Sequence, residues 1–361
     1  MNRLVIDTAA LRKNIAVIRK QADGTPVYAV VKGNGYGLGL VPFAKLLKEE
    51  GINHFAVTET ADAAALRKAG LTDDEILMLT PVTDEDELKT LIENDIILTI
   101  SSNNDAVYAA GVAEEMGVVA AVHIKLDTGM GRYGFYDYGD VASIYRFMQP
   151  LAVCGIYSHF HSAFSSKKAT EAQYQQFCSF IKRLNDQGFE TGTAHIANSS
   201  ALFRHPDMKL DAVRVGSAFL GRLSFRGSFG LTKIGWAESP LTELRFLQVG
   251  SSVGYGAGYK VKKSTRIAVL PIGWYHGFGI EKGRDLWRIR DCIRGCLSLV
   301  KAALTRKKLY VTVNGKKARV LGHIGMVNTV IDVTNIDCAP GDMARLEINP
   351  LLAKGIEVEY R

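Results

Sequence analysis

Eight short apolar runs, rich in β-branched residues and separated by helical patterns, occupy the sequence from about residue 3 to 225. The runs lie at 27–31, 54–58, 75–79, 96–100, 118–126, 151–159, 191–197 and 211–216. Helical patterns separate them, for example at 41–51, 58–70 and 171–188. Alternation of strand and helix requires parallel pairing, and eight strands in this order are what a closed (β/α)8 barrel needs. We therefore predict an α/β fold with an N-terminal TIM-like barrel over residues 1–228.

The pattern changes after about residue 230, where strands are separated by turns instead of helices. Strand patterns lie at 241–250, 264–273, 308–322, 329–334 and 342–349. The Asn314-Gly315 pair inside the third of these is a strong hairpin signal. Because 361 residues exceed the size of most single cores, we predict a separate, mostly-β domain over residues 229–361.

A basic segment interrupts this β pattern. Leu286, Ile289, Ile293, Leu297, Val300 and Leu304 recur at three- and four-residue steps. Residues 281–308 hold nine Lys or Arg against three Asp or Glu, which accounts for most of the net charge of +7. The spacing predicts an inserted amphipathic helix near 284–306. It either covers the β-domain with its polar face in solvent or contacts an anionic membrane surface or a partner protein.

Other features bear on location and partners. The first residues lack the apolar run of a signal peptide, and no stretch reaches about 18 apolar residues, so we expect a cytoplasmic chain without a membrane span. Whether the chain belongs to a longer, membrane-anchored protein stays open. No nucleic-acid motif accompanies the basic segment. Cys292 and Cys296 lie one helical turn apart but lack a matching ligand pair, so no metal site is predicted.

The segment VYAVVKGNGYGLG (27–39) carries the most informative chemistry, because a buried-type strand ends in Lys32 and a glycine-rich turn follows. The carboxyl ends of barrel strands face the active site, so Lys32 would project into it. A lysine in an apolar setting loses its charge readily and can form a Schiff base with a carbonyl. Taken alone, Lys32 is equally well explained as a lysine whose head reaches solvent from the strand end.

Several further segments place charged or polar residues at predicted strand ends. They are HIKLDTGMGRYGF (123–135), GIYSHF (155–160), HIANSSA (195–201) and DAVRVGSAFLG (211–221). A guanidinium such as that of Arg132 suits a carboxylate because its donors match two oxygens at once. Without further context Lys125 and Arg132 are ordinary surface charges, and a lone histidine at a strand end, such as His159 or His195, is more often structural.

Together these segments resemble, in order along the chain, the motifs of the alanine racemase family, whose members bind pyridoxal 5′-phosphate (PLP). The resemblance implies that Lys32 carries the cofactor and that His159 supports Arg214, which faces the cofactor ring. It places the phosphate near Tyr36, Ser199, Gly216 and Ser217. It makes Arg132 the ligand of the substrate carboxylate and Lys125 the lysine that is often carbamylated to orient this arginine.

Racemisation needs an acid and a base on opposite faces of a planar carbon, and Lys32 can serve only one face. The segment SVGYGAGY (252–259) resembles the family's second-base motif, with Tyr255 as the catalytic tyrosine. In the family this tyrosine comes from the other subunit, so the resemblance implies a head-to-tail homodimer. An arginine opposite the ring nitrogen leaves that nitrogen unprotonated and weakens the cofactor as an electron sink, which favours return of the proton over side reactions.

Three departures from the family pattern leave the substrate open. In PIGWYHG (271–277) Trp274 replaces a tyrosine, and HIGMVN (323–328) retains Met326, whose backbone would meet the substrate carboxylate, but has Val327 where an aspartate is usual. GIEVEYR (355–361) replaces the family's usual C-terminal tail, and Lys354 falls where the tyrosine before that tail is expected. The resemblance predicts racemisation of alanine, serine or a bulkier amino acid, which supplies D-amino acid for peptidoglycan. The alternatives are a related PLP barrel decarboxylase and a non-catalytic PLP carrier.

Overall fold

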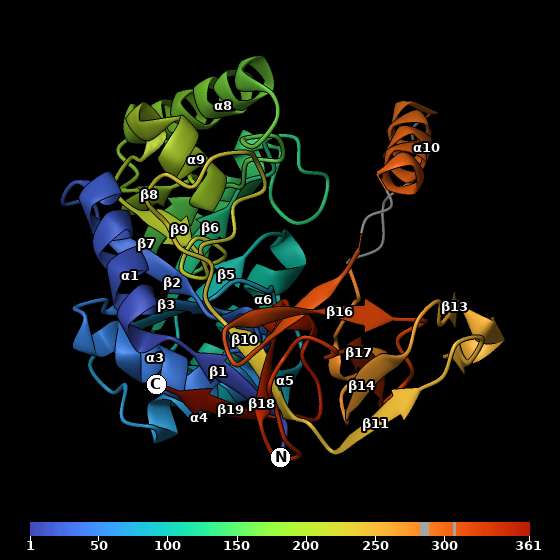
Figure 1. Ribbon diagram of the computed structural model, residues 1–361. Coiled ribbons are helices and arrows are strands. Elements are labelled where there is room, and N and C mark those ends of the chain that lie inside the picture. The colour runs from blue at the N-terminus through green and yellow to red at the C-terminus, as the bar shows by residue number, and fades with distance from the viewer. Residues whose placement is uncertain (282–288, 306–307) are drawn as a thin grey trace. The chain divides into compact units, whose positions relative to one another are not determined.

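The computed structural model describes residues 1–281, 289–305 and 308–361 (Figure 1). The chain divides into two compact units. The first unit is Thr8–Ile234, and the second combines Met1–Asp7 with Gly235–Arg361. The domain boundary predicted between residues 228 and 229 stays a prediction.

The first unit is a closed barrel of eight parallel strands. Their bounds are β2 Val27–Val30, β3 His54–Val57, β4 Glu75–Met78, β5 Leu98–Ile100, β6 Ala120–Lys125, β7 Leu151–Tyr157, β8 Thr193–His195 and β9 Val213–Val215. They form two four-stranded sheets, ordered β4-β3-β2-β9 and β5-β6-β7-β8. Parallel bridges between Leu77 and Ile97 and between His195 and Ala212 join the sheets into a ring. All eight predicted strands are confirmed.

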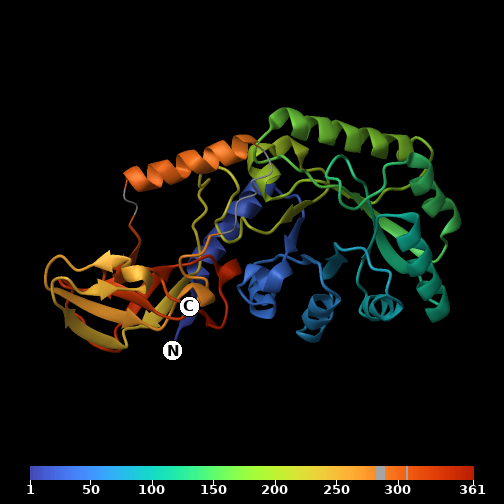
Figure 2. The same cartoon turned by 90° about the vertical axis from the view of Figure 1, so that its right-hand side faces the viewer.

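Helices lie on the outer side of these strands (Figure 2). They are α1 Thr8–Ala22, α3 Leu40–Glu49, α4 Thr60–Lys68, α5 Glu85–Glu93, α6 Asn103–Met116, α7 Tyr138–Phe147, α8 Lys167–Asn185 and the short α9 Ser199–Arg204, with a 3-10 turn, η1, at Pro206–Met208. Local sequence sets their ends. In α6 the Ser102 hydroxyl accepts a hydrogen bond from the Asp105 amide, and Gly117, with φ of 67°, ends the helix.

An apolar cluster of buried side chains fills part of the barrel interior. Tyr28, Val30, Ala56, Leu77, Ile97 and Ala212 form one buried cluster inside it. Each fully buried valine, leucine or isoleucine contributes roughly 1.5–3 kcal/mol relative to exposure. This packing fixes the positions of the strands and so of the residues at their carboxyl ends.

The second unit contains a nine-stranded sheet, ordered β11-β14-β17-β16-β15-β18-β10-β1-β19. The strands of this unit are β1 Arg3–Ile6, β10 Trp236–Pro240, β11 Glu243–Leu247, β12 Ser252–Val253, β13 Tyr259–Lys260, β14 Thr265–Leu270, β15 Tyr310–Val313, β16 Lys316–Leu321, β17 Thr329–Asp332, β18 Met343–Glu347 and β19 Glu357–Tyr360. Its 3-10 turns are η2 Tyr255–Ala257, η3 Trp274–His276 and η4 Pro350–Leu352. The hairpin predicted at Asn314-Gly315 joins β15 and β16, and both residues have positive φ, 46° and 76°.

The predicted basic helix is α10, Ile289–Leu304. Its start, predicted near residue 284 and including Leu286, lies outside the described residues. The structure does not support the interpretation that α10 covers the β-domain with its apolar face, because Ile289, Ile293 and Leu297 are exposed. Periodicity shows that a helix has two faces, but it does not show which face is covered. Among the described residues, no helix is both long enough and apolar enough to cross a bilayer.

Candidate active site

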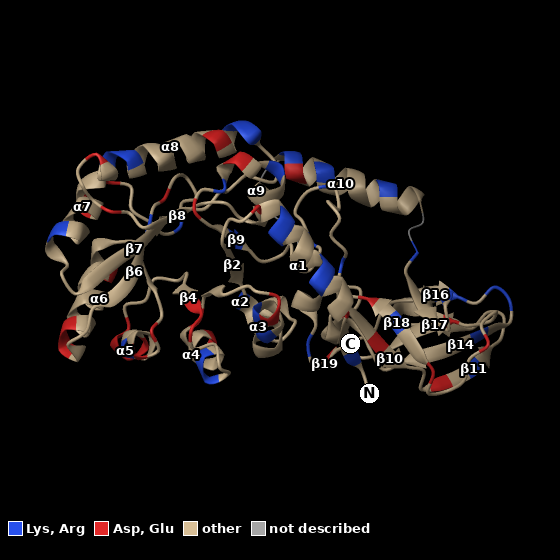
Figure 3. Ribbon diagram, turned by 90° about the vertical axis from the view of Figure 1, so that its left-hand side faces the viewer, with Lys and Arg blue, Asp and Glu red and all other residues tan. Residues whose placement is uncertain are grey.

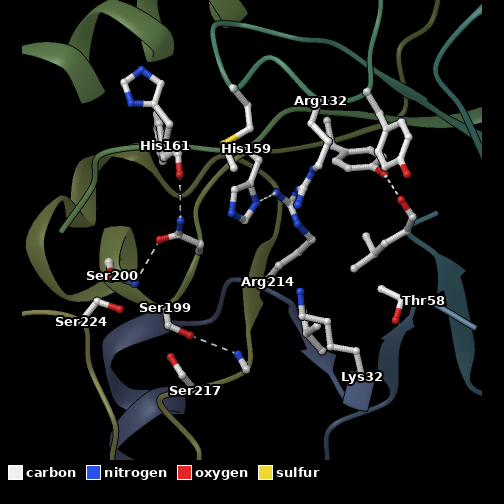
Figure 4. Close-up of a pocket in the computed structure, with 18 of the residues that line it drawn as sticks. Lys32, Thr58, Arg132, His159, His161, Ser199, Ser200, Arg214, Ser217 and Ser224 are labelled. Atoms are coloured by element: carbon white, nitrogen blue, oxygen red, sulfur yellow. Dashed lines mark hydrogen bonds between the residues drawn. The ribbon is translucent and has the colours of Figure 1, made fainter. Parts of the chain in front are cut away.

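A cavity of about 380 Å³ opens at the carboxyl ends of the barrel strands. Nine predicted site residues line it, namely Lys32, Tyr36, Lys125, Arg132, His159, Ser199, Arg214, Gly216 and Ser217. Figure 4 shows Lys32 and Thr58 on one side, Ser199, Ser217 and Ser224 on the other, and Arg214 between them. The barrel therefore brings together residues as far apart in the sequence as Lys32 and Ser217.

Lys32 follows β2 and begins a left-handed turn, labelled α2 (Lys32–Tyr36). From Gly33 to Gly37 every residue has positive φ, between 53° and 83°. Glycine adopts this region without steric cost, and asparagine tolerates it better than most residues, which explains the glycine-rich sequence. Burial by the cavity walls, followed by the positive charges of Arg132 and Arg214, lowers the pKa of the Lys32 amine. The turn thus places an amine that deprotonates readily inside the cavity.

The opposite side of the cavity is a cluster of hydroxyl and amide donors. Ser199 accepts a hydrogen bond from the Gly216 amide at 3.1 Å. A Cβ at position 216 would lie 2.3 Å from the Tyr36 hydroxyl oxygen, so only glycine lets Tyr36 approach this backbone. Burial raises the pKa of Tyr36 to about 12, so its hydroxyl remains a donor at neutral pH. With Ser217 beside it, the cluster suits an anion such as a phosphate group.

Arg214 is buried and held from several sides. Its guanidinium donates to the carbonyls of Ser158 and His195 and to Nδ1 of His195 and of His159. Burial lowers the pKa of Arg214 to about 10, so it remains charged at neutral pH. Because a guanidinium can only donate, both histidine Nδ1 atoms act as acceptors.

The chain of hydrogen bonds continues behind Arg214. Nε2 of His195 and Nδ1 of His123 are 3.0 Å apart, so the protonated Nε2 of His195 is the donor. Burial, and then the charge of Arg214, lowers the pKa of His195 well below 6.5 and that of His123 to about 3. Neutral histidines therefore hold Arg214 in place without removing its charge. His195 and His123 were not among the predicted site residues.

Lys125 is the second amine of the cavity. It is 4% exposed, and its Nζ lies 5.8 Å and 5.1 Å from the ring centres of Tyr133 and Tyr157. Burial, followed by the charges of Arg214 and Arg132, lowers its pKa to about 7. The neutral amine is therefore available near neutral pH.

Arg132 extends from a loop that Asp127 organises. The Asp127 carboxylate accepts hydrogen bonds from the amides of Gly129, Met130 and Arg132 and from the Tyr136 hydroxyl. Burial alone would raise the pKa of Asp127, but these hydrogen bonds outweigh it and lower the pKa. The carboxylate is therefore occupied in shaping the loop, and the exposed Arg132 side chain is left to bind a ligand. Asp127 was not among the predicted site residues.

Further polar residues line the cavity without having been predicted. Thr58, Thr80, His161, Ser200 and Ser224 are among them. Thr58 and Thr80 come shortly after β3 and β4, so their position at strand ends was a usable signal. Ser224 follows the last barrel strand by nine residues, counting from Val215, and no sequence pattern marks it.

The remaining predicted residues, Tyr255 and Met326, belong to the second unit, where three of the quoted motifs meet. The amides of Trp274 and Tyr275 donate to the carbonyls of Gly325 and Met326. A Cβ at Gly254 would lie 2.9 Å from the His323 amide nitrogen, which ties the Tyr255 turn to the same loop. Tyr255 is 80% exposed and Met326 is 52% exposed. The second unit thus presents both residues on one packed group of loops.

Comparisons with known proteins agree with this geometry. The family described as "Alanine racemase, N-terminal domain" matches residues 6–223, and "Alanine racemase, C-terminal domain" matches residues 236–351. The alanine racemase of Methanococcus maripaludis is 33% identical over 92% of this chain and 84% of its own length, and that of Desulforamulus reducens is 33% identical over 92% and 85%. Among solved structures, the alanine racemase from E. faecalis is 27% identical, with a TM-score of 0.81 over 100% of this chain and 98% of its own.

Proposed function

The chain belongs to the alanine racemase family, and we propose that it interconverts the L- and D-isomers of alanine with PLP held on Lys32. The observation that carries this proposal is the amine of Lys32, with its lowered pKa, in a cavity shared with Arg132 and Arg214. When bound, PLP withdraws electrons from the substrate and makes the hydrogen on its α-carbon removable as a proton.

The residues of the cavity fit PLP. Tyr36, Ser199, Gly216 and Ser217 would form a cradle that holds its phosphate. The close approach of Tyr36 to Gly216, which only glycine permits, belongs to this cradle. Lys32 would attach the cofactor through its neutral amine. This division of roles places an anion site and a nucleophilic amine on opposite sides of one cavity, as an aldehyde with a phosphate arm requires.

Arg214 and His159 would face the cofactor ring. Arg214 keeps its protons below about pH 10, so it can donate to the ring nitrogen but cannot protonate it at neutral pH. The weaker electron sink that results favours quick return of a proton to the α-carbon over side reactions. The hydrogen bonds from Arg214 to His195 and His159 hold the guanidinium in this orientation.

Two groups must handle the proton, because inversion requires removal from one face and addition to the other. We assign Lys32 to one face and Tyr255 to the other. Tyr255 belongs to the second unit and is exposed on its surface, which supports its contribution across a head-to-tail homodimer. Arg132 and the Met326 backbone would bind the substrate carboxylate. Such a cytoplasmic homodimer would supply D-alanine for peptidoglycan.

One experiment separates this proposal from its rivals. Purified protein is incubated in deuterated water with L-alanine or L-serine, and α-hydrogen exchange, D-isomer and carbon dioxide are followed. Exchange with formation of the D-isomer supports the racemase, and release of carbon dioxide supports a decarboxylase instead. Cofactor absorbance without either reaction supports a carrier. Serine is included because Trp274 and Val327 depart from the family pattern beside Met326.

Gly216→Ala should weaken PLP binding. The added Cβ would lie 2.3 Å from the Tyr36 hydroxyl, and relieving such overpacking costs roughly 1–3 kcal/mol. We expect the Kd of PLP for the apoenzyme to rise about tenfold to a hundredfold, as measured by fluorescence titration. Gly111→Ala in α6 is the matched control, because its Cβ meets nothing within 4 Å and its φ is not positive. An unchanged Kd for Gly216→Ala would show that the cradle does not bind the cofactor.

We also propose that Lys125 is carbamylated, since a neutral amine attacks carbon dioxide to give a carbamate and one proton. The pKa of about 7 means that Lys125 is neutral above pH 7 and becomes an ammonium below it. With ¹³C-bicarbonate we expect a carbamate NMR signal at pH 8 that fades below about pH 6. Lys125→Ala should remove the signal and raise the KM for alanine roughly tenfold, because Arg132 loses an oriented anionic neighbour. The exposed Lys45→Ala is the control; a signal that survives in Lys125→Ala comes from another amine.

A further inference from the structure

Helix α10 carries an apolar stripe that is open to solvent. Its members are Ile289, Ile293, Leu297, Val300 and Leu304. Their spacing of four, four, three and four residues places all five on one helical face. Their exposed fractions run from 55% to 82%. A continuous exposed apolar patch on a helix marks a surface that binds a protein or a membrane.

Basic residues follow one edge of this stripe. Arg290, Arg294 and Lys301 each come directly after a member of the stripe, about 100° further around the helix, and all three are exposed. Figure 3 marks the Lys and Arg positions along the ribbon of α10 in blue. Asp291, the acidic residue of α10, pairs with Arg294 at 3.3 Å. The cationic edge and the apolar stripe therefore form one combined surface.

The less exposed residues of α10 lie off the stripe, mostly on the opposite face, and Cys292, nearer the stripe, is half-buried as well. Gly295 is buried, and Asp291 and Ala302 are half-buried. Each of these three residues stands two positions after a member of the stripe, which is about 200° around the helix. The apolar stripe is therefore left uncovered, whereas packing of α10 against its own domain would have buried it.

We propose that α10 lies flat in the headgroup layer of an anionic lipid membrane. The stripe would enter the acyl boundary, and Arg290, Arg294 and Lys301 would contact lipid phosphates from its edge. At 16 residues, or about 24 Å, α10 is shorter than the roughly 20 residues that a span requires, so it rests on the membrane surface. A second copy of the chain in an antiparallel arrangement fits this face poorly, because that pairing through the stripes would bring the two cationic edges together.

Vesicle flotation with the full chain tests the proposal. We expect binding to phosphatidylcholine vesicles with about 30% phosphatidylglycerol, weak binding without the anionic lipid, and release as salt is raised. Leu297→Glu and Ser298→Glu are a matched pair, because each adds one negative charge at neighbouring exposed positions. Leu297→Glu should lower the partition coefficient at least about tenfold, and Ser298→Glu much less.

The charge arm uses the triple variant Arg290→Glu, Arg294→Glu, Lys301→Glu, which should lose about a hundredfold or more in affinity for the anionic vesicles. Racemase activity and circular dichroism in lipid-free buffer confirm that each variant is folded. Absence of vesicle binding by the folded wild-type chain overturns the proposal. Equal effects of Leu297→Glu and Ser298→Glu also overturn it, as does a Leu297→Glu variant that binds vesicles normally but dissociates into smaller oligomers, which would make the stripe a contact between copies.

Discussion

Lys32→Ala should abolish both covalent attachment of PLP and racemisation. Loss of a positioned proton-transfer group alone costs about 10²–10⁴-fold in rate, and loss of the covalent link adds to this. The visible absorbance of the bound cofactor should disappear, and borohydride reduction of the wild type should fix PLP on the peptide that contains Lys32. The exposed Lys45→Ala should leave spectrum and rate unchanged.

The cavity offers a real competitor for this role, because Lys125 also has a lowered pKa. Two observations favour Lys32. Lys125 is 4% exposed and lies near two tyrosine rings, whereas Lys32 is exposed in the cavity and begins a turn built of glycines. Reduction therefore discriminates between them: PLP recovered on Lys125 in the wild type would reverse the two assignments.

The barrel was predictable because its information is local. A parallel strand that is buried on both faces reads as a continuous apolar run, and all eight such runs became strands. β1 is different, because Arg3–Ile6 pairs with β10 and β19, which lie more than 200 residues away. A run of four residues does not indicate which distant strands it will pair with. For that reason the predicted barrel domain, residues 1–228, includes β1.

Part of the site was also predictable from the sequence. Strand ends and glycines indicated Lys32, and the resemblance supplied the roles proposed for Arg132, Lys125 and Arg214, which isolated residue types could not. The hydrogen bonds from Arg214 through His195 to His123 were not predictable, because they join positions 72 and 19 residues apart and depend on which ring nitrogen carries a proton. The exposure of the α10 stripe was not predictable either, because periodicity does not show which face of a helix is covered.

Tyr255→Phe should retain PLP but lose inversion. The phenol hydroxyl is the group that would exchange a proton on the face opposite Lys32, so the turnover rate should fall about 10²–10⁴-fold. Lys32 still serves its own face, and one isomer of alanine should therefore continue to exchange its α-hydrogen for deuterium without inverting. Tyr259→Phe, four residues further along the same segment, is the control. Wild-type inversion by Tyr255→Phe would remove the tyrosine from the reaction.

Mixing the two inactive variants tests where Tyr255 acts. If Tyr255 serves the partner's cavity, a mixed dimer of Lys32→Ala and Tyr255→Phe has one site with both defects and one site with neither. Random mixing makes about half of the dimers mixed, so about a quarter of wild-type activity should return after the subunits are exchanged. If Tyr255 instead serves the cavity of its own chain, every site keeps one defect and no activity returns. Recovery of activity therefore requires both the dimer and the shared site.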